Sequence, residues 1–229
     1  MNHYAIIVAG GTGTRMNSKV PKQFLIVDDE PIIVKTLRKF REAIPHISII
    51  VVLPADQLSR WKSLADQFPF INDIAIAEGG DTRTASVVSG LSRINGDGIV
   101  CIHDAVRPYV ELSTISASIE SAKKFGSGVA AVPLKDSIRE IFSGKKSAAR
   151  NRNNYVLVQT PQTFDVRKLK NAYSKIEKQN FTDDASVYEY AGEEVYLVEG
   201  SYSNIKITTP DDLIWAEALL EKQSDQLED

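Results

Sequence analysis

The stretch Tyr4-Ala5-Ile6-Ile7-Val8-Ala9-Gly10-Gly11-Thr12-Gly13-Thr14-Arg15-Met16 joins a short apolar run to a glycine-rich loop. The apolar run predicts a buried strand over residues 4–8. Glycines let backbone N–H groups approach an anion closely, because no Cβ stands in the way. Arg15 and Lys22 add two cations at the mouth of the loop. The stretch therefore predicts a phosphate site at the end of the first strand of an α/β sheet.

The loop matches neither of two common phosphate-binding motifs. A P-loop closes with Gly-Lys-Ser/Thr, whereas here Gly13 is followed by Thr14 and Arg15. A dinucleotide fingerprint needs a third glycine, and Met16 occupies that position. A bulky side chain there would spoil the close packing of helix on strand, which disfavours an NAD-dependent dehydrogenase. A plain surface turn is the remaining alternative, and the glycines beside two cations argue against it.

Composition and charge are those of an ordinary globular protein. The 229 residues are 43% hydrophobic and 25% charged, which predicts one domain over 1–229. A net charge of −3 argues against a nucleic-acid partner. Cys101 is the only cysteine and lies in an apolar run, so we expect a buried structural thiol. With no leader-like N-terminus and no long apolar run, we expect a cytoplasmic protein without membrane contact.

Apolar patterns of strand and helix type alternate along the chain. Strands are predicted over 4–8, 47–53, 74–77, 99–102, 128–132, 195–198 and 204–207. Helical spacing covers 33–44, 58–68, 87–94, 112–122 and 213–220, with Asp81 and Thr209 as candidate N-caps. The alternation favours a Rossmann-like fold with a mostly parallel twisted sheet flanked by helices. The polar tail, 222–229, is expected to fray.

One polar segment, about 135–160, breaks this alternation. It carries a turn signal at Ser143-Gly144-Lys145-Lys146 between β-prone residues, and it is too long for an ordinary connection. The segment predicts a protruding β-arm. Because such an arm usually packs on something, a second subunit is the simplest partner.

Polar clusters follow several of the predicted strands. They occupy 10–22, 79–86 and 103–108, and further candidates are 182–186 and Lys206. Ligands of parallel α/β sheets bind beyond the carboxyl ends of the strands. Singly, each cluster has an ordinary explanation: Asp81 could cap a helix, and His103 could be a buried structural imidazole. Their joint placement on one sheet edge predicts a shared site.

Taken together, the motifs resemble those of the 2-C-methyl-D-erythritol 4-phosphate cytidylyltransferases of the non-mevalonate isoprenoid pathway. The matching segments keep the family's order, and they are 9–16 with Pro21-Lys22-Gln23, 79–83, 103–108, 159–162, 182–186 and 204–206. The resemblance implies a nucleotidyltransferase fold and transfer of CMP from CTP to a polyol phosphate. Such a reaction needs no protein nucleophile, so catalysis would consist of positioning and charge stabilisation.

The resemblance also implies roles for single residues. Nucleotide binding falls on Ala9, Gly10, Gly11, Gly13, Gly80, Asp81, Ser86 and Asp104. Catalytic cations would be Arg15, Lys22, Arg152 and Lys206. The polyol phosphate would meet Arg107, Ser137, Arg152, Thr182 and Lys206. Mg²⁺, or another divalent cation, is the implied cofactor, with Asp104 as its candidate ligand. In the family the arm reaches across a homodimer, so the site would be composite.

Three other functions remain open at this point. A ribitol 5-phosphate cytidylyltransferase would share the glycine loop, the 103–108 motif and the reaction type. The motifs at 80–83 and 182–186 favour methylerythritol phosphate. A sugar-1-phosphate nucleotidyltransferase would use UTP or GTP instead of CTP. A non-catalytic nucleotide-binding module is disfavoured, because it would not need two separate sets of cations.

Overall fold

A central sheet of seven strands organises the described residues of the computed structural model, which are 1–10, 16, 20–144, 146–177 and 181–225. Its order is β11-β7-β10-β6-β1-β4-β5. The strands are β1 (His3–Val8), β4 (Ser48–Leu53), β5 (Ala75–Glu78), β6 (Ile99–Asp104), β7 (Ser127–Pro133), β10 (Val156–Asp165) and β11 (Leu197–Glu199). Only β10 runs antiparallel to its neighbours in this sheet. The predicted Rossmann-like α/β fold is therefore confirmed.

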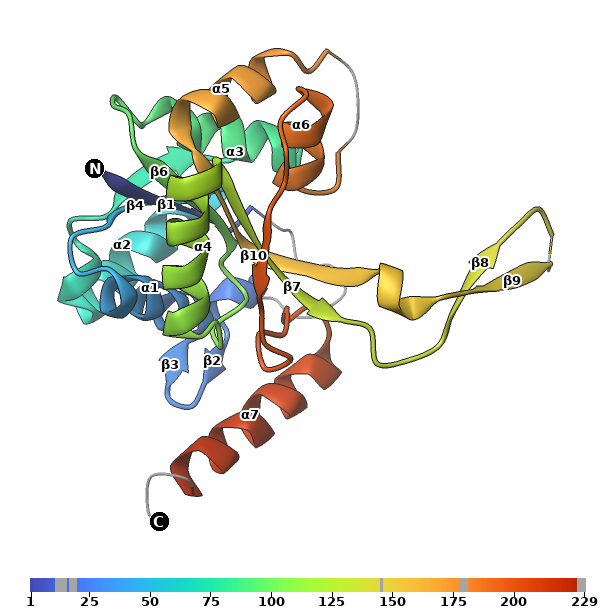
Figure 1. Ribbon diagram of the computed structural model, residues 1–229. Coiled ribbons are helices and arrows are strands. Elements are labelled where there is room, and N and C mark those ends of the chain that lie inside the picture. The colour runs from blue at the N-terminus through green and yellow to red at the C-terminus, as the bar shows by residue number, and fades with distance from the viewer. Residues whose placement is uncertain (11–15, 17–19, 145, 178–180, 226–229) are drawn as a thin grey trace.

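Helices cover both faces of the sheet (Figure 1). One layer holds α1 (Ile32–Ala43), α2 (Leu58–Gln67) and α4 (Leu112–Phe125). The other holds α3 (Arg83–Ser92), α5 (Val166–Ser174) and α6 (Asp184–Tyr190). Ile7 packs into the first layer and Ile6 into the second, as alternation along a strand requires. Because both faces are covered, the central strands are continuous apolar runs.

Smaller elements complete the molecule. The short strands β2 (Ile26–Val27) and β3 (Glu30–Pro31) form a hairpin beside α1. A third apolar cluster joins this hairpin to α7 (Pro210–Asp225) through Val27 and Ala216. Short 3₁₀ helices lie at Lys22–Phe24, Ala55–Gln57, Pro69–Ile71 and Arg152–Asn154. Within the described residues, no helix is both long and apolar enough to cross a bilayer.

The predicted strand at 204–207 is wrong. This segment pairs with no strand, although the Ile207 N–H donates to Val106 O at 2.9 Å. The side chain of Asn204 is fully buried and donates instead to Thr160 O at 2.8 Å. Polar side-chain contacts therefore replace a strand ladder here.

Two predictions about helix ends also need correction. Thr82, not Asp81, caps α3, since its hydroxyl accepts from Ala85 N at 3.0 Å. At the other end of the chain, α7 continues to Asp225 and so enters the tail expected to fray. The sequence from 221 to 225 contains neither Gly nor Pro, which accounts for the longer helix. Residues 226–229 lie outside the described part of the chain.

The segment expected to form an arm projects from the body of the protein (Figure 1). Strands β8 (Ile138–Ile141) and β9 (Ser147–Arg150) pair as an antiparallel hairpin between β7 and β10. Large apolar side chains are exposed along this arm and its base, namely Ile141, Phe142, Tyr155, Val156, Leu157 and Val158.

Gly128 provides a test of the packing between β7 and α4. A Cβ at this position would lie 2.3 Å from the backbone oxygen of Ser118, closer than real contacts allow. We expect Gly128→Ala to lower the free energy of unfolding by about 1–3 kcal/mol, because helix and strand must separate. Gly79→Ala is the control, since its Cβ would meet Ser86 Oγ at an ordinary 3.4 Å. Equal urea midpoints for both variants would contradict this packing.

Candidate active site

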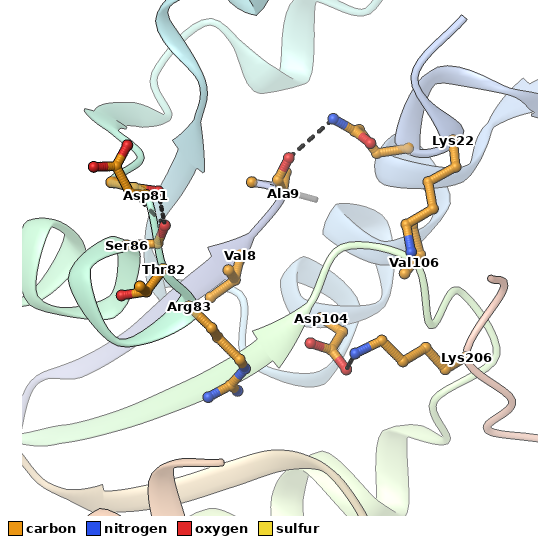
Figure 2. Close-up of a pocket in the computed structure, with 13 residues that line it drawn as sticks. Val8, Ala9, Lys22, Asp81, Thr82, Arg83, Ser86, Asp104, Val106 and Lys206 are labelled. Carbon is orange, nitrogen blue, oxygen red and sulfur yellow. Dashed lines mark hydrogen bonds and ion pairs between the residues drawn. The ribbon is translucent and has the colours of Figure 1, made fainter. Parts of the chain in front are cut away.

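A hollow of about 190 Å³ opens where β1 and β6 end beside the start of α3. Figure 2 shows side chains from these separate elements gathered around it. Its lining residues are Val8, Ala9, Gly10, Lys22, Gln23, Gly80, Asp81, Thr82, Arg83, Ser86, Asp104, Val106 and Lys206. The described residues predicted to bind the nucleotide all belong to this lining. The predicted residues Gly11, Gly13 and Arg15 lie outside the described part of the chain.

Two contacts shape opposite walls of this hollow. Buried Gln23 donates from Nε2 to Ala9 O at 2.9 Å, which holds the chain as it leaves β1. Opposite, the Gly80 N–H donates to Ser86 Oγ at 3.2 Å. A Cβ on Gly80 would lie 2.5 Å from that of Ala85, so a side chain would displace this loop. These contacts fix the backbone on two sides of the hollow.

Asp104, the last residue of β6, forms the floor between two cations. Its Oδ2 accepts from Lys206 Nζ at 3.0 Å and from Arg107 Nε at 3.2 Å. Burial alone would raise the pKa of this carboxyl, but the charges of Lys206, Arg107 and Arg83 hold it well below its ordinary value. Asp104 therefore remains ionised and fixes the positions of its cations.

A second hollow of about 230 Å³ lies directly beside the first. It is lined by Arg83, Asp104, Arg107, Val158, Gln159, Thr160, Gln162, Thr182, Asp183 and Lys206. Three of the residues predicted to bind the polyol phosphate, Arg107, Thr182 and Lys206, belong to this lining. Arg83, Asp104 and Lys206 border both hollows, so ligands bound in the two would meet at these three side chains.

Asn204 and Gln162 support this second hollow, although the sequence alone indicated a role for neither. Asn204 O accepts from an Arg107 N–H at 2.7 Å, and the Asn204 side chain is tied to β10. Gln162 Oε1 accepts from Asp184 N at 2.9 Å and Ala185 N at 2.8 Å. Both residues stood inside quoted motifs, but only the fold reveals the distant groups they hold.

A family model described as 2-C-methyl-D-erythritol 4-phosphate cytidylyltransferase, IspD, matches residues 3–222. The chain belongs to this family. It is 43% identical to the enzyme of that name from Phocaeicola vulgatus over 220 residues, which are 96% of this chain and 100% of the relative. It is 39% identical to the enzyme of that name from Bacillus velezensis, with 98% of each chain covered.

Solved structures give the same family. A 4-diphosphocytidyl-2C-methyl-D-erythritol synthase from Anaerococcus prevotii matches with a TM-score of 0.84 at 29% identity, covering 96% of this chain and 98% of that one. The bifunctional IspDF of Campylobacter jejuni matches with a TM-score of 0.79 at 28% identity, covering 93% of this chain and 54% of that chain. The comparisons confirm the resemblance and support methylerythritol phosphate over ribitol phosphate.

Two residues that the resemblance predicted for the site lie away from both hollows. Arg152 and Ser137 line neither hollow in the described residues. Arg152 is exposed at the base of the arm, where a guanidinium N–H donates to Lys135 O. Within one described chain, Arg152 therefore does not line the hollows that Lys206 borders.

Metal binding would depend on few protein ligands. Among the described residues, no group of three or more His, Cys, Asp or Glu side chains could enclose an ion. Asp104 is a single carboxylate bordering both hollows. That donor set fits Mg²⁺, which commonly takes one or two carboxylates and substrate phosphates.

His103 has a structural position next to the site. The ring is fully buried, lies with Nε2 at 3.2 Å from Arg107 O, and packs edge-on to Phe40 at 5.0 Å between centroids. Burial is the main cause that lowers the pKa of His103 to about 4. The imidazole is therefore neutral at ordinary pH.

This neutral imidazole predicts a pH dependence of stability. Unfolding returns the pKa of His103 to about 6.5, so below that pH the unfolded chain binds a proton that the folded chain excludes. The contribution of neutral His103 to the free energy of unfolding is fully present above pH ~6.5. It falls by about 3 kcal/mol as the pH drops toward 4. In urea titrations, wild type should lose more stability over this range than His103→Gln. Parallel losses would contradict a buried neutral ring.

Proposed function

We propose that this protein transfers the cytidylyl group of CTP to 2-C-methyl-D-erythritol 4-phosphate. The products are 4-diphosphocytidyl-2-C-methyl-D-erythritol and pyrophosphate. One observation carries the proposal beyond family membership: two adjacent hollows share a wall that contains Asp104 and Lys206. A transferase must bring two phosphorylated substrates together at their reacting atoms, and a shared wall provides such a meeting place.

The first hollow suits CTP. Gly80 and Ser86 line it on the side that we assign to the base and ribose, and Ala9 and Gly10 line it where β1 ends, on the side that we assign to the phosphates. Lys22 lines the same hollow and adds a positive charge. By the family pattern, Arg15 joins it. The second hollow, with Arg107 and Thr182, suits the phosphate and hydroxyls of the polyol.

The chemistry requires an in-line displacement. A phosphate oxygen of methylerythritol phosphate forms a bond to the α-phosphorus of CTP, and the bond to the β-phosphate bridging oxygen breaks to release pyrophosphate. Lys22 and Lys206 stabilise the charge on the phosphates, and Asp104 keeps Lys206 in place by the 3.0 Å ion pair. Bound Mg²⁺, held by phosphates and Asp104, would neutralise further phosphate charge.

We also propose that the working enzyme is a homodimer joined through the arm. Two observations support this: the apolar side chains along the arm are exposed, and Arg152 lies away from both hollows of its own chain. In a dimer, an arm reaching the partner would deliver Arg152 to the partner's second hollow. The single domain over 1–229 and the cytoplasmic location remain predictions from the sequence.

Substrate preference tests the reaction. With CTP, pyrophosphate release should be clearly faster with methylerythritol phosphate than with ribitol 5-phosphate, and UTP or GTP at low concentration should not replace CTP. Steady-state kcat/KM for each pair is the measurement. A preference for ribitol 5-phosphate would overturn the acceptor. Binding of CTP without product from any polyol phosphate would reduce the protein to a nucleotide-binding module.

Subunit mixing tests the composite site. Arg152→Ala and Lys206→Ala homodimers should each lose about 10²-fold in kcat, since each lacks one charge at the phosphates. Purified heterodimers of the two variants should regain about half of wild-type activity, because one of the two symmetric sites carries neither substitution. Absence of recovery in verified heterodimers would mean that each site is built within one chain.

A further inference from the structure

Three side chains border both hollows, and one of them has no role in the reaction described above. Asp104 and Lys206 are accounted for, whereas Arg83 is not. Arg83 opens α3 at the end of the Gly79–Thr82 loop. In Figure 2 its guanidinium and Lys206 lie on opposite sides of the Asp104 carboxylate. The charge of Arg83 is also felt by Asp104.

Arg83 is held in place by a carboxylate from a distant part of the chain. Its NH2 group donates to Asp184 Oδ2 at 2.6 Å across 101 positions of sequence. Asp184 is fixed in turn, since its Oδ1 accepts from the Tyr173 hydroxyl at 2.5 Å and its N–H donates to Gln162. The guanidinium is therefore anchored at one edge by a preformed, buried acceptor.

Arg83 is more exposed than Asp184, although an ion pair that served only to stabilise the fold could be buried on both sides. The Asp184 side chain is 0% exposed, whereas that of Arg83 is 25% exposed and borders both hollows. A guanidinium carries five N–H donors in a planar fork. Among the described residues, Asp184 is the acceptor that this fork reaches. Donors remain for oxygen atoms of ligands.

We propose that Arg83 is a further catalytic residue, which donates hydrogen bonds to the phosphates of both substrates where the two hollows meet. This inference rests on the proposed function. Phosphates of CTP and of the acceptor repel each other, so their approach needs positive charge between them. Lys206 supplies a point charge on one side of Asp104, and Arg83 supplies a planar fork that suits phosphate on the other. Asp184, Tyr173 and Gln162 are positioning residues for this guanidinium.

The rival explanation is that Arg83 only neutralises the buried Asp184. A double-variant cycle separates this explanation from a catalytic role, because the Tm reports on the ion pair and kcat reports on catalysis. Arg83→Gln leaves a buried carboxylate unpaired, so the Tm should fall by roughly 5 °C or more. Adding Asp184→Asn removes that unpaired charge, while the amide oxygen still accepts from Tyr173. The double variant should therefore regain Tm.

Activity should not return with stability. We expect kcat with CTP and methylerythritol phosphate to fall about 10²-fold in Arg83→Gln and to stay low in the double variant. Recovery of kcat together with Tm would overturn the proposal.

Arg83→Lys decides the question if the double variant does not regain stability. It keeps the charge opposite Asp184 but loses the fork, so kcat should drop at least ~10-fold at nearly unchanged Tm. Wild-type kcat in Arg83→Lys would also overturn it.

A matched control is available on the far side of the sheet. Arg41 pairs with Asp73 at 2.6 Å outside both hollows, and Arg41→Gln should leave kcat unchanged. Wild-type turnover is the reference for the whole series. An inactive wild type with these substrates would refute the proposed function and this inference with it. An active wild type whose double variant is also active would refute only the role of Arg83.

Discussion

The buried carboxylate of Asp104 is the constraint on which the site depends. A carboxylate that has left water is tolerated only when cations and hydrogen bonds replace its hydration. Lys206 and Arg107 provide that replacement at 3.0 and 3.2 Å, although Lys206 lies about a hundred residues further along the chain. The loop carrying Lys206 must therefore return to the end of β6. Once it does, a shared wall between two hollows follows.

The sheet could be predicted from sequence because its chemistry is local. Ile6 and Ile7 face two covered sides, so an apolar run was a sufficient signal for β1. The same rule failed at 204–207, where Ile205 and Ile207 imitate a strand. There no ladder forms, and the side chain of Asn204 donates to Thr160 O of β10. An alternating apolar pattern indicates which side chains are buried. It does not reveal which groups form hydrogen bonds with the backbone N–H and C=O groups.

Residues of the site could be predicted only where a recognisable motif follows the end of a predicted strand. Gly80, Ser86 and Asp104 stood in recognisable motifs at strand ends, and they meet in one hollow. The pairing of Arg83 with Asp184 had no such signal, because two motifs 101 residues apart carry no mark of contact. Gln162 was hidden for the same reason. Long-range hydrogen bonds belong to the fold, and single-sequence periodicity does not encode them.

The arm exposes apolar side chains that neither hollow covers. Leu157 and Ile141 remain 53% and 77% exposed, and leaving such apolar surface in water is unfavourable. In the proposed dimer, a second copy would cover this surface and would also carry Arg152 to a phosphate. The free energy that assembles the dimer and the charge that completes the site would then come from one segment. Under the proposed composite site, an isolated subunit would contain both hollows but lack one of their cations, so assembly itself would control activity.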